Sequence, residues 1–372
     1  MHSTHFFEKI QQHFNSALPF VVYRKPNRLE VHAMLQKDEK LHVIEDYTES
    51  GFVFSPFDAK EQAVYLPVAN SEMISSDFIF TDKEEKSAAA DSIIPKEKEA
   101  HIQLVQKGID AIHNKALQKV VLSRCEAQAL SEENPLKIFK HLLQKYATAF
   151  VYCWYHPQVG LWLGATPETL LKVQANRFST MALAGTQIYT GTKDVVWQDK
   201  EKEEQQIVTD FVVNSLKFAA NSINVSNVET VRAGSLLHLK TAISGTLKKE
   251  DATFKEVLSS LHPTPAVCGF PKENAKQFII NNENYKRGFY AGFLGELNIK
   301  ETKSRNTNRR NVENNAYASV KTVSNLFVNL RCMQLKNKQA LIYVGGGITK
   351  DSIAENEWQE TVNKTQTIKA VL

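Results

Sequence analysis

The sequence has few cysteines and no long apolar run. Four of its 372 residues are cysteines, and none of them forms a Cys-x-x-Cys pair: Cys125, Cys153, Cys268 and Cys332. Zinc sites and disulfide frameworks need closely spaced cysteines, so neither is expected. No apolar stretch approaches the ~20 residues that a membrane-spanning helix needs. We therefore expect reduced cysteines and no membrane partner.

Export and nucleic-acid binding are not indicated either. Residues 1–9 lack a basic segment followed by an apolar run and a small-residue cleavage site, which favours a cytoplasmic protein. The formal net charge is +4, and residues 300–321 alone supply it, because six basic minus two acidic side chains gives +4. A nucleic-acid-binding protein carries a larger basic excess with interleaved aromatic residues. We expect a solvated polar loop at this segment and no nucleic-acid partner.

The first 95 residues are rich in strand-like segments. Short runs of β-branched and aromatic residues at 18–23, 28–35, 51–55 and 63–67 alternate with polar or proline turns, which is typical of antiparallel sheets. Between residues 81 and 100 the composition shifts to Lys, Glu, Ser and Ala, which predicts a linker.

From residue 100 onward, strand-like and helix-like segments alternate. Residues 326–330 have strand character, whereas residues 201–221 carry apolar side chains at helical spacing. Runs of strands followed by helices predict an α+β fold with large, mainly antiparallel sheets packed face to face and helices outside. We expect one interlocked body over 1–372, with a strand-rich part (1–95) and a catalytic region (100–372).

Three segments rich in proline and glycine interrupt this region. They are HPTPAVCGFP from His262, LGATPET from Leu163 and GGGIT from Gly345. Each follows or interrupts an apolar segment, as a rigid loop at a strand end does, so we expect all three to line a site. The glycine run allows backbone N–H groups to approach an anion. It is neither a Walker loop nor a GxGxxG motif, so nucleotide binding is not supported.

Two glutamate pairs have helical spacing. Glu201 and Glu204 lie three residues apart, as do Glu357 and Glu360, so each pair occupies one helix face. Four carboxylates from two helices could hold a hard cation such as magnesium. The alternative is two solvated helix faces, which is the usual meaning of such spacing.

Three other charged residues flank apolar strands. Lys119 either extends to solvent or is desolvated, which would favour its neutral form and let it act as a base. Glu168 follows Pro167 at a strand end, where burial would raise its pKa and provide a general acid; an exposed turn glutamate is the alternative. Arg331 ends the strand 326–330, where its planar fork suits a bound carboxylate or a structural ion pair equally.

In this order the motifs resemble those of the chorismate-binding enzymes, which include isochorismate, salicylate, anthranilate and aminodeoxychorismate synthases. The resemblance covers residues 100–372 and rests on KVVLSR from Lys119, LAGT from Leu183, HPTPA from His262 and EWQET from Glu357. Within the family, the motifs are most similar to those of isochorismate synthases. The resemblance implies the fold of anthranilate synthase component I and a magnesium-dependent, reversible conversion of chorismate to isochorismate without a redox cofactor.

The resemblance also implies roles for individual residues. Lys119 matches the base that activates water for attack at ring carbon 2, and Glu168 matches the acid that protonates the hydroxyl leaving from carbon 4. The matching metal positions are Glu204 and Glu360 as magnesium ligands, with Glu201 and Glu357 supporting metal-bound waters. The positions that match the substrate pocket are Gly185, Ala266, Arg331, Tyr343, Gly345, Gly347 and Lys364.

Three positions distinguish the branches of the family. Ala184 stands where aminodeoxychorismate synthases with a covalent mechanism carry lysine, and a methyl group cannot attack carbon 2. Anthranilate-type enzymes lack the water-activating lysine that matches Lys119. Salicylate synthases, which go on to eliminate pyruvate, generally carry threonine where this chain has Ala266. These residues favour a reaction that stops at isochorismate, with salicylate synthesis as the alternative.

The chain departs from the family pattern before its first metal position. The segment KEKEEQ from Lys200 keeps only the charge scheme of the family, so Glu203 competes with Glu204 as the ligand. Glu283 and Arg287 match positions near the metal, where a structural i to i+4 pair is at least as plausible as a catalytic role.

The last expectations concern the oligomeric state and the metabolic pathway. We expect a monomer that takes chorismate as its partner and serves menaquinone synthesis, with catechol siderophores as the alternative. A competing class is a catalytically silent relative that binds an acidic partner through residues 300–321. Retention of both Lys119 and Glu168 argues against it, because a silent protein need not keep acid and base.

Overall fold

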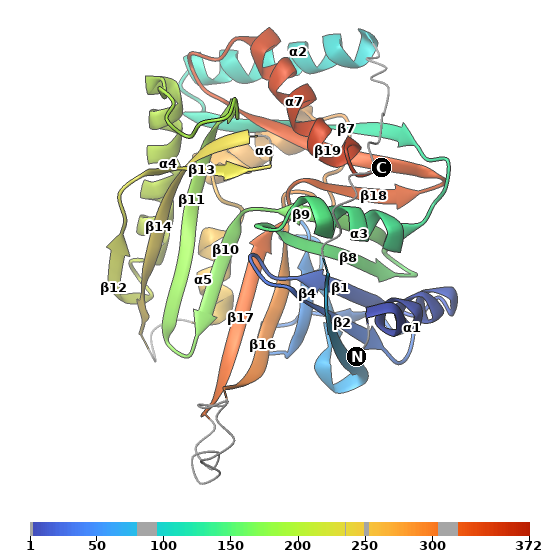
Figure 1. Cartoon of the computed structure of the whole chain (residues 1–372). Helices are drawn as coiled ribbons and strands as arrows, with labels where there is room; N and C mark the ends of the chain where they lie inside the picture. Colours follow the sequence, from blue (N-terminus) through green and yellow to red (C-terminus); the bar gives the residue numbers. More distant parts are fainter. Residues whose placement is uncertain (1–2, 80–94, 235, 249–252, 304–318) are drawn as a thin grey trace.

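The computed structural model describes residues 3–79, 95–234, 236–248, 253–303 and 319–372. Within them, two antiparallel sheets carry seven α-helices (Figure 1). No helix in these ranges is long and apolar enough to cross a membrane. Most of the basic segment and most of the expected linker, residues 304–318 and 80–94, lie outside the described residues.

The first sheet has nine strands, and every neighbouring pair is antiparallel. In spatial order they are β15 (Gly269–Phe270), β7 (Lys119–Ala129), β19 (Gln339–Ile348), β18 (Cys332–Lys336), β9 (Gly160–Thr166), β8 (Phe150–His156), β1 (Phe20–Arg24), β2 (Glu30–Gln36) and β6 (Ser71–Asp77).

The second sheet has ten strands, nine in its main path and β13 (Glu229–Ala233) paired beside β14, and its neighbouring strands are again antiparallel. In spatial order the nine strands of the main path are β12 (Ala220–Val225), β14 (Leu236–Leu247), β11 (Arg177–Ile188), β10 (Thr169–Gln174), β17 (Ser319–Val328), β16 (Phe293–Lys303), β4 (Gly51–Ser55), β5 (Val64–Pro67) and β3 (His42–Val43).

The helices lie on the outer faces and ends of the two sheets (Figure 1). They are α1 (Ser3–Asn15), α2 (Pro95–His113), α3 (Pro135–Lys145), α4 (Asp199–Leu216), α5 (Phe254–Leu261), α6 (Lys272–Asn282) and α7 (Ala354–Lys369), with a short 3₁₀ helix, η1 (Val68–Asn70). Helices α1 and α3 pack on the first sheet, α4 packs against β11 and β14, and α7 packs against β19 and α2. The expected α+β architecture is therefore confirmed.

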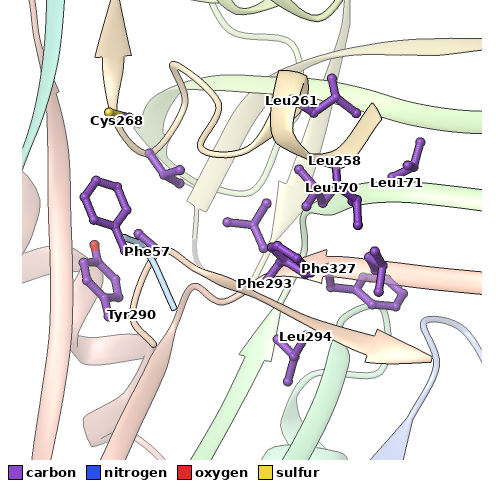
Figure 2. Packing of buried hydrophobic residues seen from close by; sticks show 14 of the residues in the cluster. Phe57, Leu170, Leu171, Leu258, Leu261, Cys268, Tyr290, Phe293, Leu294 and Phe327 are labelled. Carbon is purple, nitrogen blue, oxygen red and sulfur yellow. The ribbon is translucent and has the colours of Figure 1, made fainter. Parts of the chain in front are cut away.

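Aromatic side chains fill the core between the two sheets. Phe150 of β8 stacks on Phe327 of β17 with ring centroids 4.1 Å apart, and Tyr23 of β1 meets Phe52 of β4 at 5.0 Å. Figure 2 shows part of this core, including Phe327 and its apolar neighbours. All five residues of β1 are buried because the helices cover the opposite face of its sheet.

Strands from the first 80 residues extend both sheets. In the first sheet β1 pairs with β8, and in the second β4 pairs with β16. The strand-rich part therefore shares hydrogen-bonded sheets with the later region. This continuity supports our proposal that the chain forms one body.

Three local predictions were wrong. The helix expected over 201–221 ends at Leu216, because residues 220–225 pair with β14 as a strand. The strand expected to reach residue 330 ends at Val328, and Arg331 lies in a turn with φ of 47°. The glycines from Gly345 to Gly347 form no loop; they pair with β7 as part of β19.

Candidate active site

Most of the residues expected at the site line one cleft that opens to solvent. These are Glu168, Gly185, Glu204, Ala266, Arg331, Tyr343, Gly345, Gly347, Glu360 and Lys364. Lys119 and Glu201 do not line the cleft but lie next to residues that do, Glu204 and Gly185 respectively, and Glu357 lies next to Gly346 of β19. The cleft is thus built mainly from β7, β19, β11 and the connections that follow β9 and α5.

Lys119 is the first residue of β7 and is fully buried. Its Nζ lies 2.9 Å from Oε1 of Glu204 on α4, so the alternative that it extends to solvent is wrong. Burial opposes ionisation of Glu204, but the charge of Lys119, with smaller contributions from Lys364 and Lys200, outweighs burial and holds the pKa of Glu204 below its ordinary value. The pair brings a base candidate and a metal-ligand candidate together.

Glu168 lies in the two-residue connection between β9 in the first sheet and β10 in the second. Its backbone carbonyl accepts a hydrogen bond from Val328 at 3.0 Å, and its side chain is buried rather than exposed in a turn. Burial raises the pKa of Glu168 to about 8, and the nearby charges of Lys119 and Arg331 offset only part of that rise. The carboxyl is therefore mostly protonated at neutral pH, as a general acid must be.

The carboxylates of α4 and α7 meet at the glycines of β19. A side chain at Gly347 would overlap Oε1 of Glu204 and would lie 3.2 Å from Cε of Lys119. Residues 346 and 347 face opposite sides of the strand. A Cβ atom at Gly346 would lie 3.5 Å from Oε1 of Glu360 and 3.6 Å from Oε2 of Glu357. Glycine is therefore needed at position 347, where a Cβ atom would overlap a carboxylate oxygen, whereas the contacts at position 346 are ordinary van der Waals distances.

Each of the three carboxylates is compensated by a lysine. Besides the Lys119 pair, Lys200 contacts Glu357, and Nζ of Lys364 lies 2.6 Å from Oε1 of Glu360. Burial, and then the charge of Glu360, raise the pKa of Glu357 despite its contact with Lys200. Like-charged carboxylates held this close favour a bound cation between them.

The carboxylates of α4 and α7 are chemically suited to bind magnesium. In the ranges that the structure describes, no three His, Cys, Asp or Glu side chains are already arranged around one point as metal ligands. However, Oε2 of Glu201 is buried without a hydrogen-bond partner, and carboxylate oxygens are the ligands that magnesium prefers. Glu203, in contrast, is 60% exposed and faces Lys350 at 3.6 Å, so the geometry favours Glu204 over Glu203 as a ligand.

His238 is a cleft residue that sequence reasoning missed. It lies in β14, and its Nδ1 is 2.7 Å from the carbonyl oxygen of Gly185, while Nη2 of Arg331 lies 3.3 Å from its Nε2. Burial and the charge of Arg331 lower the pKa of His238 to about 3. The histidine in the apolar run Leu236 to Leu239 was the available signal, but such a residue usually belongs to the core.

Aromatic stacking holds Tyr343 in the wall of the cleft. Its ring lies between Trp162, at 5.3 Å and 18°, and Tyr290, at 5.5 Å and 17°. Tyr290 also lines the cleft and was not expected from the sequence. Arg331 forms no ion pair with a carboxylate of the described residues, and its Nη1 is buried without a partner. The guanidinium therefore has donors available for an anion in the cleft.

Comparison with known proteins shows to which family the chain belongs. A family model described as chorismate binding enzyme matches residues 53–303, and a second with the same description matches residues 316–370. The chain is 29% identical over 315 residues to the chloroplastic isochorismate synthase of Catharanthus roseus, covering 81% of this chain and 50% of that protein. It is 28% identical over 346 residues to anthranilate synthase component 1 of Lactococcus lactis, covering 89% and 68%.

A solved structure shares the fold along nearly the whole chain. It is described as a putative 2,3-dihydroxybenzoate-specific isochorismate synthase, DhbC, from Bacillus anthracis. The two superpose with a TM-score of 0.76 at 19% identity, covering 97% of this chain and 98% of that one. Since the first family model alone spans well over half of the residues, the protein belongs to the chorismate-binding enzymes.

Proposed function

We propose that the protein is an isochorismate synthase, which converts chorismate to isochorismate reversibly and depends on magnesium. The observation that carries the proposal is that a buried lysine, Lys119, lies near enough to the buried carboxyl of Glu168 to influence its pKa, which burial raises to about 8. Isomerisation by exchange of a hydroxyl group needs one group that takes a proton from water and another that gives a proton to the leaving hydroxyl.

The proton balance follows from these two groups. Lys119 accepts a proton from a water molecule as the water oxygen bonds to ring carbon 2. Glu168 donates its proton to the hydroxyl on carbon 4, which leaves as water. One water enters and one leaves, so no oxidant or reductant is needed. Return of a proton from Lys119 to Glu168 through solvent restores the starting state.

The other cleft residues bind and orient the substrate. Arg331 and the backbone of Gly345 and Gly347 suit the carboxylate of the enolpyruvyl side chain, and Tyr343 packs beside it. Glu204 and Glu360 would hold magnesium, with Glu201 and Glu357 supporting its waters. When bound, the ion supplies positive charge that orients and neutralises the ring carboxylate.

Anthranilate synthesis is the second candidate, because an anthranilate synthase component is about as similar in sequence as an isochorismate synthase. Lys119 favours the first activity, since it matches the residue that activates water. Menaquinone as the end product, the cytoplasmic location and the monomeric state are predictions that stand on the sequence alone.

One assay tests the proposal. Purified protein is incubated with chorismate, with and without magnesium and with and without ammonia, and the products are separated by chromatography. Isochorismate that forms only with magnesium, and without anthranilate, salicylate or pyruvate, is the expected result. Anthranilate that forms with ammonia would establish the second candidate instead. No turnover under any condition would favour a silent relative.

A further inference from the structure

Glu283 and Arg287 form a buried ion pair just after α6. Nη2 of Arg287 lies 2.6 Å from Oε1 of Glu283, and Nε lies 2.9 Å from Oε2, so the contact is a two-pronged one. The two side chains are 3% and 2% exposed. A buried pair of this kind carries a large desolvation cost and persists only where further hydrogen bonds satisfy both groups.

Those further hydrogen bonds join two walls of the cleft. Arg287 donates through Nη1 to the carbonyl of Val267 at 2.8 Å and through Nη2 to the carbonyl of Val121 at 2.7 Å. Val267 belongs to the segment that follows α5, whereas Val121 belongs to β7, two residues after Lys119. Both valines line the cleft. Arg287 therefore binds the loop and the strand to each other through one guanidinium.

Glu283 strengthens the attachment to β7. Its Oε1 accepts hydrogen bonds from the backbone N–H of Ser123 at 2.8 Å and from Ser123 Oγ at 2.7 Å. Ser123 lies opposite Gly345 of β19 in the sheet, and the hydroxyl of Tyr285 lies 2.7 Å from Ser123 Oγ. The acidic partner is thus anchored on the strand that carries the proposed base.

Two aromatic rings lie beside the guanidinium of Arg287. The Phe57 ring lies 4.5 Å from the Arg287 carbon, and the Tyr290 ring lies 5.8 Å away. Figure 2 shows Phe57 and Tyr290 next to one another in this part of the core. Tyr290 stacks on Tyr343, and both line the cleft. Arg287 is therefore next to three residues of the cleft wall, namely Val121, Val267 and Tyr290.

Arg287 is not among the residues that line the cleft, unlike the candidate substrate-binding residues. A lysine has the same charge, but it lacks the planar fork that reaches Glu283, Val267 and Val121 together. Arg287 donates hydrogen bonds to two backbone carbonyls besides its ion pair with Glu283. Compensating the charge of one carboxylate would not require these two hydrogen bonds. Both facts favour a role in placing the cleft walls.

We propose that Arg287, held by Glu283, is a positioning residue that fixes the loop bearing Ala266 and Val267 against the strand bearing Lys119. The proposal rests on the isochorismate synthase function in one respect, that the rate of this reaction reports the placement. Because a displacement of about 1 Å at a reacting centre costs about 100-fold in rate, loss of the clamp should lower kcat more than it changes KM.

The test compares Arg287→Lys with wild type and with Lys286→Ala, a control at the exposed neighbouring residue. We expect Arg287→Lys to lower kcat by about 10- to 100-fold with KM changed less than about threefold. In Arg287→Ala, added guanidinium chloride at millimolar concentration should restore part of kcat. Hydrogen exchange of residues 262–271, measured without substrate, should become faster in both variants and stay unchanged in the control.

The outcomes separate the two proposals. Unchanged exchange of residues 262–271, or an unchanged kcat in a folded Arg287→Lys variant, would overturn the positioning role. If the wild type makes no isochorismate, the proposed function fails, whereas the hydrogen-exchange measurement still decides the clamp. If Arg287→Lys does not fold, Glu283→Gln takes its place, because it keeps the shape of the acceptor and removes its charge.

Discussion

Arg331 donates a hydrogen bond to the neutral ring of His238, with 3.3 Å between Nη2 and Nε2. The carbonyl of Gly185 can only accept, so the histidine proton lies on Nδ1, which donates to that carbonyl at 2.7 Å. This leaves Nε2 as an acceptor, which a guanidinium requires. The histidine therefore connects two proposed substrate-binding residues and fixes the direction of the arginine fork.

Replacing His238 should disorient Arg331. His238→Phe leaves two buried polar groups without partners, which costs about 1–3 kcal/mol for each group. We expect kcat/KM for chorismate to fall by at least about tenfold, mainly through KM, because the substrate carboxylate loses an aligned fork. Steady-state kinetics would measure this, with Lys240→Gln on the same strand as control. An unchanged KM in folded His238→Phe would contradict the assignment.

The proton on Glu168 predicts a pH dependence of the rate. Its pKa is raised to about 8, so the acid is protonated below that pH and loses its proton above it. The rate of isochorismate formation should therefore fall as pH rises through about 8. Glu168→Gln should lower kcat by about 100- to 10,000-fold. The decrease in rate above pH 8 should also disappear in this variant. If the decrease in rate above pH 8 persists in Glu168→Gln, it is caused by the titration of another group.

The same carboxyl predicts how stability changes with pH. Between its ordinary pKa and the raised value of about 8, the folded state binds a proton that the unfolded state has lost. The free energy of unfolding should thus decrease as pH rises through this window. Glu168→Gln removes the titrating group, so its Tm should decline less than that of the wild type between pH 5 and pH 8. Parallel thermal melts of the two proteins would show the difference, and identical slopes would refute it.

Magnesium should stabilise the protein through Glu204 and Glu360. Binding to the folded state alone raises the free energy of unfolding by about 2.7 kcal/mol at an ion concentration 100 times Kd. This increment should disappear in Glu204→Gln and Glu360→Gln. It should persist in Glu203→Gln, whose side chain is 60% exposed and paired with Lys350. Thermal melts with and without magnesium measure it without any turnover, and loss in Glu203→Gln alone would reverse the ligand assignment.

Glycine at position 347 should be more critical than glycine at 346. Gly347→Ala would place a methyl group against Oε1 of Glu204 and 3.2 Å from Cε of Lys119, whereas Gly346→Ala meets its nearest atom at 3.5 Å. We expect kcat to fall by about 100-fold in Gly347→Ala and by much less in Gly346→Ala. Kinetics of the two variants provide a matched pair, and equal losses would argue against contact with the proposed base.

The identity of residue 266 should decide whether pyruvate is released. Ala266 lines the cleft, and a hydroxyl there is what the salicylate branch of the family carries. Ala266→Thr should release some pyruvate with isochorismate, whereas Ala266→Val, which has the same shape without the hydroxyl, should not. A coupled pyruvate assay measures both. Complete absence of pyruvate from a folded, active Ala266→Thr would show that another position discriminates.

Sequence reasoning reached the fold and most of the cleft because local pattern and motif order agree there. The position of Glu168 after Pro167 at a strand end marked it as a candidate acid, although only the structure decides between a buried and an exposed side chain, and strand-like composition predicted β4 at its observed bounds. Helical spacing brought Glu201 and Glu204 to one face. These features depend on neighbours in sequence, so the sequence alone reveals them.

The features that were missed depend on contacts between distant segments. Gly345 to Gly347 continue β19 because β7 provides hydrogen-bonding partners, which no local pattern reports. The helix α4 ends early because the next residues pair with β14. His238 has no spacing relation to Arg331, 93 residues away, and only the folded sheet brings them together.

The connection from β9 to β10 has a consequence for the chemistry. Only Pro167 and Glu168 separate a strand of one sheet from a strand of the other, so this stretch has no slack. The proposed proton donor cannot shift unless the two sheets slide past each other, which their stacked aromatic core resists. Substitutions deep between the sheets, remote from any substrate atom, should therefore be felt as changes in proton delivery as well as in melting temperature.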